Sequence, residues 1–183
     1  GLLALRLLGI SATFADAWLW NHPTDGTVNA LRSLWAVTVH ERMRLRVVAD
    51  AAATALFGIS AQDLKDLVFA SDRPVGALDE GSLPPNGFWR VDKDKDPELR
   101  HPVLALVAFH DLEEKIRSCG DDREAGIEAF LAQNDGEGWM LPETLRLADY
   151  GLGHDDRAKQ HQPVASRLGP RFYEWQLAQS AEE

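Results

Sequence analysis

Apolar residues recur at helical spacing along most of the chain, and the alternating patterns typical of strands are scarce. The first apolar run predicts a helix that ends at about Trp20. A turn-forming stretch, 21–26, follows it, and Thr27 can cap a second helix. The apolar face of this second helix consists of Leu31, Leu34, Trp35 and Val37. Two helices joined by a short turn predict a helical hairpin.

The helical spacing continues from about His40 to Leu56. Gly58 follows at the place where a helix end favours glycine in the left-handed conformation. Ser60 and Asp63 have the spacing of a capping pair, so a short helix is expected after them. The segment 1–70 is therefore predicted to be helical.

Residues 71–101 interrupt this pattern with four prolines and three glycines. They predict a long loop, and loops of this length in a compact domain tend to be functional or mobile. Within the loop, Phe88–Val91 is a candidate short strand. The alternating charges of Asp92–Asp96 suit a solvated surface.

Residues 102–183 return to helical signals. The apolar run Val103–Phe109 fits either a strand or a buried helix, but its i, i+4 stripe continues beyond the run and favours a helix that ends at Gly120. Asp121 or Asp122 can cap the next helix, which ends at 134–136.

Two shorter helices are predicted near the end of the chain. Pro142 occupies a favoured first helical position, and Gly151 closes that helix. Gly169 and Pro170 lead into a last helix, whose apolar residues are Phe172, Trp175 and Leu177. The expected fold class is mainly α: an irregular multi-helix domain with a long loop and at most a short strand element, forming one compact unit that is part of a larger chain.

The composition of the chain limits the classes of function that it can have. The chain of 183 residues is 45% apolar and has a formal net charge of −10, so it is expected to repel phosphate backbones unless its bases gather on one face. Its single cysteine, Cys119, excludes an internal disulfide framework and predicts a reduced, cytoplasmic setting. Arg6 and Asp16 fall within the first apolar run, which favours a buried core helix over a membrane span.

Candidate catalytic motifs are incomplete. His110 and Asp111 form the dyad of helical metal-dependent phosphohydrolases, with His40, His101 and Asp149 as conceivable further ligands. Their spacing matches no metal template, so no metal site is assigned, and a helix-end histidine beside a solvated acid is the simpler interpretation. We therefore expect no catalytic residue and no cofactor in this segment.

Three stretches of the chain are informative because of their exact order of residues, beyond their spacing of apolar and polar positions. Val47–Leu64 reads VVADAAATALFGISAQDL, an acidic, alanine-rich helix followed by a Phe-Gly-Ile-Ser turn; Gly87–His101 reads GFWRVDKDKDPELRH; and Leu141–Asp155 reads LPETLRLADYGLGHD. Together they resemble the C-terminal region of large bacterial S-adenosylmethionine-dependent, adenine-specific DNA methyltransferases of restriction-modification and phage-defence systems. The similarity runs from about residue 40 to the end.

The resemblance implies a parent enzyme that uses S-adenosylmethionine and acts on double-stranded DNA, together with other domains or subunits of the same system. The family's catalytic Asn or Asp, followed by Pro-Pro and an aromatic residue, is missing here: Leu83–Asn86 has the order Leu-Pro-Pro-Asn. The segment is therefore expected to be a non-catalytic accessory or DNA-recognition part. The alternatives are a helical protein–protein interaction module and, more remotely, the phosphohydrolase.

Basic residues in the loop and near the C-terminus are the candidate contacts to DNA phosphates. Trp89 is the candidate for stacking on a base, although an aromatic residue at a loop edge more often anchors the loop to the core. The candidate phosphate contacts are Arg90, Lys93, Lys95, Arg100, Arg167 and Arg171.

Overall fold

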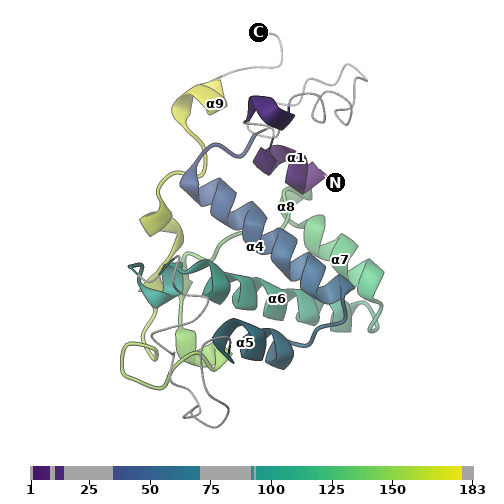
Figure 1. Ribbon diagram of the computed structural model, residues 1–183, viewed down its shortest axis with the longest axis vertical. Coiled ribbons are helices and arrows are strands. Elements are labelled where there is room, and N and C mark those ends of the chain that lie inside the picture. The colour runs from purple at the N-terminus through teal and green to yellow at the C-terminus, as the bar shows by residue number, and fades with distance from the viewer. Residues whose placement is uncertain (1, 9–10, 15–34, 71–91, 93, 179–183) are drawn as a thin grey trace.

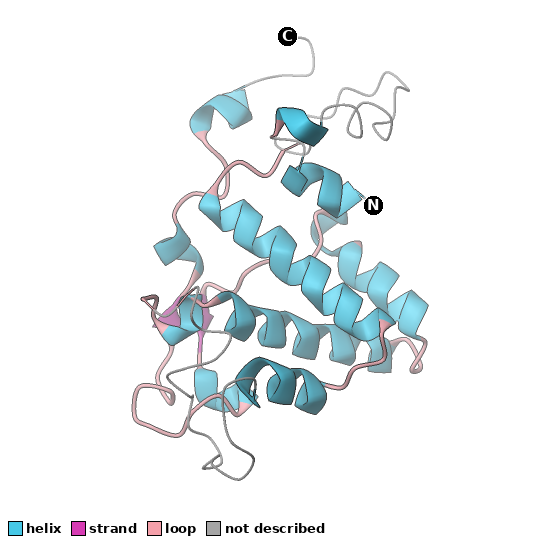
Figure 2. Ribbon diagram, in the orientation of Figure 1, coloured by secondary structure: helices cyan, strands magenta, loops and turns pink. Residues whose placement is uncertain are grey.

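The computed structural model describes residues 2–8, 11–14, 35–70, 92 and 94–178 (Figure 1). Within these residues the fold is mainly helical, as predicted, with one small antiparallel strand pair (Figure 2). The α-helices are α1 (Leu2–Leu8), α4 (Val39–Leu56), α5 (Ala61–Ala70), α6 (His101–Ser118), α7 (Arg123–Leu131), α8 (Gln133–Gly136) and α9 (Glu174–Ala178). The shorter elements are the 3₁₀-helices η1 (Ala12–Phe14), η3 (Pro97–Leu99), η4 (Leu147–Tyr150) and η5 (Ala165–Leu168), and the strands β1 (Thr144–Leu145) and β2 (Gln162–Pro163).

Helix α6 is the centre of the structure. Helix α4 crosses it, and α5 and α7 pack against it as well (Figure 1). All seven residues of Val103–Phe109 are buried, which confirms the helical alternative for this run. A helix that is apolar all round requires neighbours on every side, and this requirement explains its central position.

Local capping signals set the ends of α4. The Thr38 hydroxyl accepts a hydrogen bond from the Glu41 N–H at 3.1 Å and satisfies one of the unpaired donors of the first turn. At the other end Gly58 adopts a left-handed φ of 68°, and the Ile59 N–H donates to the Thr54 carbonyl at 3.1 Å. This is the Schellman arrangement, and the prediction at Gly58 is confirmed.

The junctions that follow α4 and α6 were also predicted from the sequence. The Ser60 hydroxyl and the Asp63 carboxylate cap α5 reciprocally. Gly120 has a φ of 73° after α6, and the Asp122 carboxylate accepts from the Ala125 N–H at 3.0 Å to cap α7. These caps need only neighbouring residues, so they are visible without tertiary information.

Several helix predictions are wrong in whole or in part. The first helix ends at Leu8, well before Trp20, and a 3₁₀-helix follows at Ala12–Phe14. Residues 35–37 are not helical, because the helix begins only after Thr38. Pro142 does not open a helix: its carbonyl accepts from the Ala165 N–H at 3.2 Å beside the β1–β2 pair, and only the 3₁₀-helix η4 precedes Gly151. The last helix begins at Glu174, after Phe172. At Ala36, whose N–H donates to the Arg6 carbonyl at 3.0 Å, and at Pro142, a contact with a distant segment replaces the local helical preference.

Some predictions fall outside the described residues. These are residues 15–20 of the predicted first helix, the part of the second helix before residue 35, and the strand at Phe88–Val91. Among the helices that the structure describes, none combines the length and the apolar character needed to cross a membrane.

Candidate functional site

The described residues of the turn from Asp92 to Arg100 include two of the predicted basic residues, Lys95 and Arg100. The Asp92 carboxylate accepts the His101 backbone N–H at 3.0 Å and pairs with the Lys95 ammonium at 2.7 Å. Burial opposes ionisation of Asp92, but these two donors outweigh it and lower the pKa of its carboxyl. The Arg100 guanidinium donates to the Lys95 carbonyl at 2.8 Å. The bases of this turn are therefore held by the turn itself.

Two further arginines reach this turn from the C-terminal part of the chain. Arg157 donates to both oxygens of Glu98, at 2.9 and 2.8 Å. Arg167 pairs with Asp96 at 2.5 Å. The hydrogen bond from Arg167 is the main cause that lowers the pKa of Asp96. We call Asp96, Glu98, Arg157 and Arg167 the arginine–carboxylate cluster.

Exposure within this cluster is uneven. The side chain of Glu98 is fully buried, whereas 40% of Arg157 and 45% of Arg167 remain accessible. The carboxylates thus orient two guanidinium groups whose remaining N–H donors face solvent. Arg157 was not predicted from the sequence. It directly follows Asp155 and Asp156, so the net charge of this short segment is negative and does not indicate a basic surface.

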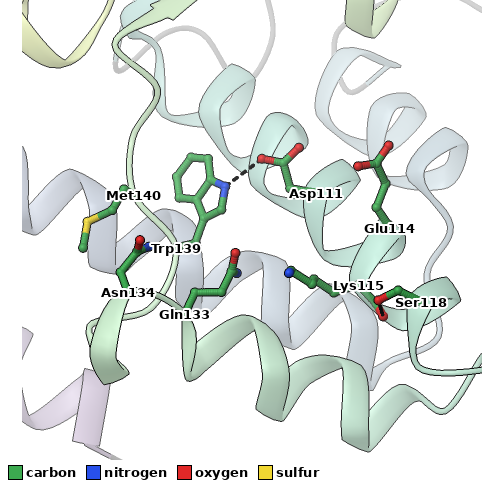
Figure 3. A pocket seen from close by; sticks show the side chains of 8 residues that line it. All are labelled: Asp111, Glu114, Lys115, Ser118, Gln133, Asn134, Trp139 and Met140. Carbon is green, nitrogen blue, oxygen red and sulfur yellow. Dashed lines mark hydrogen bonds between the residues drawn. The ribbon is translucent and has the colours of Figure 1, made fainter.

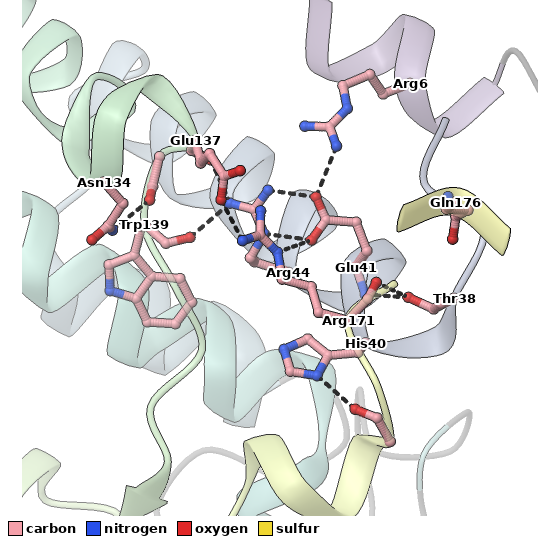
Figure 4. A network of polar contacts seen from close by, with 12 residues as sticks. Arg6, Thr38, His40, Glu41, Arg44, Asn134, Glu137, Trp139, Arg171 and Gln176 are labelled. Atoms are coloured by element: carbon pink, nitrogen blue, oxygen red, sulfur yellow. Dashed lines mark hydrogen bonds and ion pairs between the residues drawn. The ribbon is translucent and has the colours of Figure 1, made fainter. Parts of the chain in front are cut away.

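Arg171 lies elsewhere, in a buried network with Glu41 at its centre (Figure 4). The Glu41 carboxylate accepts from Arg6 at 2.9 Å, from Arg171 at 2.9 Å and from two nitrogens of Arg44 at 2.8 and 2.6 Å. Arg171 also pairs with Glu137. This Glu41 network joins α1, the start of α4, the segment after α8 and the C-terminal segment.

The central residues of the Glu41 network are shielded from solvent. Arg44 and Glu41 are both fully buried, and the remaining Arg44 donors reach the carbonyls of Glu137 at 2.6 Å and Trp139 at 2.9 Å. Burial opposes ionisation of Glu41, but the hydrogen bonds from Arg44 and Arg171 are stronger and lower the pKa of the Glu41 carboxyl from 4.5 to about 2. Glu41 is therefore a carboxylate at neutral pH.

The structure separates the predicted phosphate contacts into two groups. Lys95, Arg100 and Arg167 share the surface of the Asp92–Arg100 turn, and Arg171 belongs to the Glu41 network. The other predicted contacts lie outside the described residues: Arg90, Lys93 and the stacking candidate Trp89.

The histidine–aspartate pair on α6 has separate partners. His110 packs edge-on against Tyr150 with ring centroids 5.4 Å apart, while Asp111 accepts the indole N–H of Trp139 at 2.7 Å. Burial raises the pKa of Asp111, partly opposed by this hydrogen bond. Of the remaining histidines considered, His40 contacts the Gly169 carbonyl and His101 contacts Asp50. Within the described ranges, no three His, Cys, Asp or Glu side chains are grouped to hold a metal ion.

Two contacts link the described parts of the three sequence stretches, or a residue next to them. His101, which ends the second stretch, contacts Asp50 of the first at 2.6 Å. Lys65, next to the first stretch, donates to the Gly151 carbonyl of the third at 2.9 Å. The described parts of these stretches therefore border α6, which begins at His101, packs against α4 and contacts Tyr150 through His110.

Comparison with known proteins identifies no relative. No family model, no curated protein and no solved structure matches this chain.

Proposed function

We propose that this chain is a non-catalytic accessory segment of a large S-adenosylmethionine-dependent, adenine-specific DNA methyltransferase, where it helps to hold double-stranded DNA. The proposal is supported by the resemblance of Val47–Leu64, Gly87–His101 and Leu141–Asp155 to that family. The single observation that carries it is the convergence of these stretches against α6, through the contacts of His101 with Asp50 and of Lys65 with Gly151. A shared sequence signature is more informative when its parts form one unit.

The arginine–carboxylate cluster is the surface that suits this role. An arginine already oriented by a carboxylate loses less side-chain entropy when it contacts a phosphate, and its planar fork of donors fits phosphate oxygens. Arg157 and Arg167 are held in this way and are still accessible.

The charge of the chain limits how strong such a contact is. Asp96 and Glu98 offset the charge of the two arginines, and the net charge of −10 repels DNA over longer distances. At physiological salt, charges more than about 8 Å away are largely screened, so the close contacts decide the interaction. The segment therefore supplies a few oriented phosphate contacts within a larger DNA-binding protein.

The double variant Arg157→Ala/Arg167→Ala in the full methyltransferase tests this role. We expect weaker binding to a duplex oligonucleotide and a salt dependence of log K whose slope is smaller by about one to two, since each lost phosphate contact removes roughly 0.9 from the slope. Fluorescence anisotropy at several salt concentrations measures both. Arg117→Ala is the matched control, because Arg117 is an exposed α6 arginine outside the cluster. Unchanged affinity and slope in the double variant would reject the DNA-contact role.

An interaction module is the second candidate, and exposed apolar side chains favour it. Leu56 is 63%, Phe57 82% and Leu67 58% exposed, at the end of α4 and on α5. Exposed apolar groups of this size commonly mark binding surfaces. An immunoblot of the source cells separates the two candidates. A band several times larger than the 20.3 kDa of this chain supports the methyltransferase segment, and a band near 20.3 kDa supports the free-standing module.

A further inference from the structure

A polar pocket lies between α6 and the α7–α8 junction, away from the arginine–carboxylate cluster (Figure 3). Its volume is about 520 Å³, which is enough for a small ligand or one large side chain. The residues that line it are Asp111, Glu114, Lys115, Ser118, Gln133, Asn134, Trp139 and Met140.

Three side chains of this pocket each donate one hydrogen bond to the protein. The Trp139 indole N–H donates to Asp111 at 2.7 Å, the Gln133 amide nitrogen donates to the Phe130 carbonyl at 3.0 Å, and the Asn134 amide nitrogen donates to the Gly138 carbonyl at 2.9 Å. A carbonyl partner accepts only from the NH₂ end of an amide, so these contacts fix the orientation of both amides.

The acceptors of the pocket are left available. In the part of the chain that the structure describes, no donor reaches the side-chain oxygens of Gln133 and Asn134, and the hydrogen bond from Trp139 uses only one oxygen of Asp111. Glu114 adds a second carboxylate, with Arg117 as its partner at 3.8 Å. The lining thus offers several oxygen acceptors in a half-enclosed space.

Lys115 is the one basic residue among the lining residues. Figure 3 shows its side chain and that of Gln133 pointing toward one another across the pocket. Two carboxylates against one ammonium leave the lining with a formal charge of −1. The long, flexible stem of a lysine allows its ammonium to leave for solvent when another cation enters.

We propose that this pocket binds a guanidinium group, presented either by a free arginine derivative or by an arginine side chain of a protein partner. The planar guanidinium carries five N–H donors and no acceptor, which complements the carboxylate and amide oxygens of the lining that accept from no described donor. A compact divalent cation fits less well, because it needs six or more oxygens at about 2.0–2.6 Å and would lie next to the Lys115 ammonium. The site is independent of the DNA contacts proposed above.

Titration of the ¹⁵N-labelled chain with L-argininamide tests the proposal. The Trp139 indole N–H is the reporter, because it donates directly to Asp111. Its resonance is assigned with Trp139→Phe, and L-citrullinamide, which has a neutral group of nearly the same shape, is the control ligand. We expect a saturable shift with argininamide and none with citrullinamide. No saturable shift, or an equal response to both ligands, would overturn the proposal.

Three variants assign the binding to this pocket. Asp111→Asn and Glu114→Gln each remove a charge and are expected to weaken argininamide binding at least fivefold, whereas Lys115→Met removes the competing ammonium and is expected to strengthen it. Glu124→Gln, on the exposed side of α7, is the control and should leave affinity unchanged. Unaltered affinity in both carboxylate variants would place the ligand elsewhere. The Glu114 variant keeps the test valid even if the Asp111 variant does not fold.

The source of the guanidinium is distinguished by a second ligand. A capped Gly-Arg-Gly peptide that binds more tightly than argininamide indicates an arginine side chain of a protein partner. Tighter binding of argininamide indicates a free small molecule.

Discussion

The Glu41 network and the arginine–carboxylate cluster use the same chemical pair in opposite surroundings. In the Glu41 network, Arg44 and Glu41 are fully buried, and both carboxylate oxygens of Glu41 accept from a guanidinium. In the second, Glu98 is buried but its partner Arg157 is 40% exposed. Burial therefore determines whether an arginine contacts only the protein or remains accessible to a ligand.

The same difference separates the surroundings of Arg171 and Arg167, although both were predicted as phosphate contacts. The Arg171 guanidinium contacts two carboxylates, Glu41 and Glu137, and is 22% exposed. Its position joins the C-terminal segment to α4, and Thr38 strengthens the same junction by donating to the Arg171 carbonyl at 2.7 Å. Arg171 thus stabilises the fold, whereas Arg167 is partly exposed beside Asp96.

The largest expected effect comes from breaking the buried network. Glu41→Ala leaves Arg44 charged, buried and without its main partner, and such losses typically cost about 3–5 kcal/mol of unfolding free energy. Chemical denaturation followed by circular dichroism measures the change. The matched control is Glu114→Ala, an exposed α6 position where about 0.5 kcal/mol or less is expected. Equal costs at the two positions would contradict the central role assigned to Glu41.

Acid is expected to weaken the same network. The pKa of Glu41 is about 2 in the folded chain against an ordinary value of 4.5, so the folded state favours the carboxylate. Its contribution is fully present above pH 4.5 and is lost as pH falls toward 2. At about 1.4 kcal/mol for each pKa unit, the loss is on the order of 3 kcal/mol. Denaturation midpoints of the wild type and of Glu41→Gln between pH 5 and pH 2 should converge as the pH falls; a constant difference would refute the linkage.

The smallest effect is expected in the exposed cluster. Asp96→Asn weakens the pair with Arg167, but both side chains are more than 40% exposed, so water and salt screen the interaction. We expect a loss of well under about 1 kcal/mol, which becomes smaller in high salt. Thermal melts at low and high salt measure it. A loss comparable to that of Glu41→Ala would remove the distinction between the two regions.

Several helix ends could be predicted from the sequence, whereas others could not. Gly58, Gly120 and Asp122 were read correctly because their hydrogen-bond partners lie within a few residues. Pro142 was read wrongly because its segment pairs with residues about twenty positions later, where the Val164 N–H donates to the Glu143 carbonyl at 2.9 Å. A local helix signal cannot compete with backbone pairing that local rules do not include.

The candidate sites depend on long-range contacts. Lys95, Arg100 and Arg167 were predicted from the sequence. Their common surface depends on ion pairs that join Arg157 and Arg167 to carboxylates about 60 to 70 residues earlier in the chain. The sequence singled out Asp111 beside His110 but not the oxygen-rich pocket around it, since the lining comes from α6 and from the segment around Gln133 and Trp139.

The sequence by itself determined that the described part of this chain is mainly helical, where α4 and α6 end, where α5 and α7 are capped, and that Val103–Phe109 lies in a core, because spacing and capping act between near neighbours. Only the tertiary structure decided which charged residues are paired and which remain accessible. The physical reason is that the energy of a charge depends on its solvation and on partners contributed by distant segments. A local pattern of residues contains neither quantity.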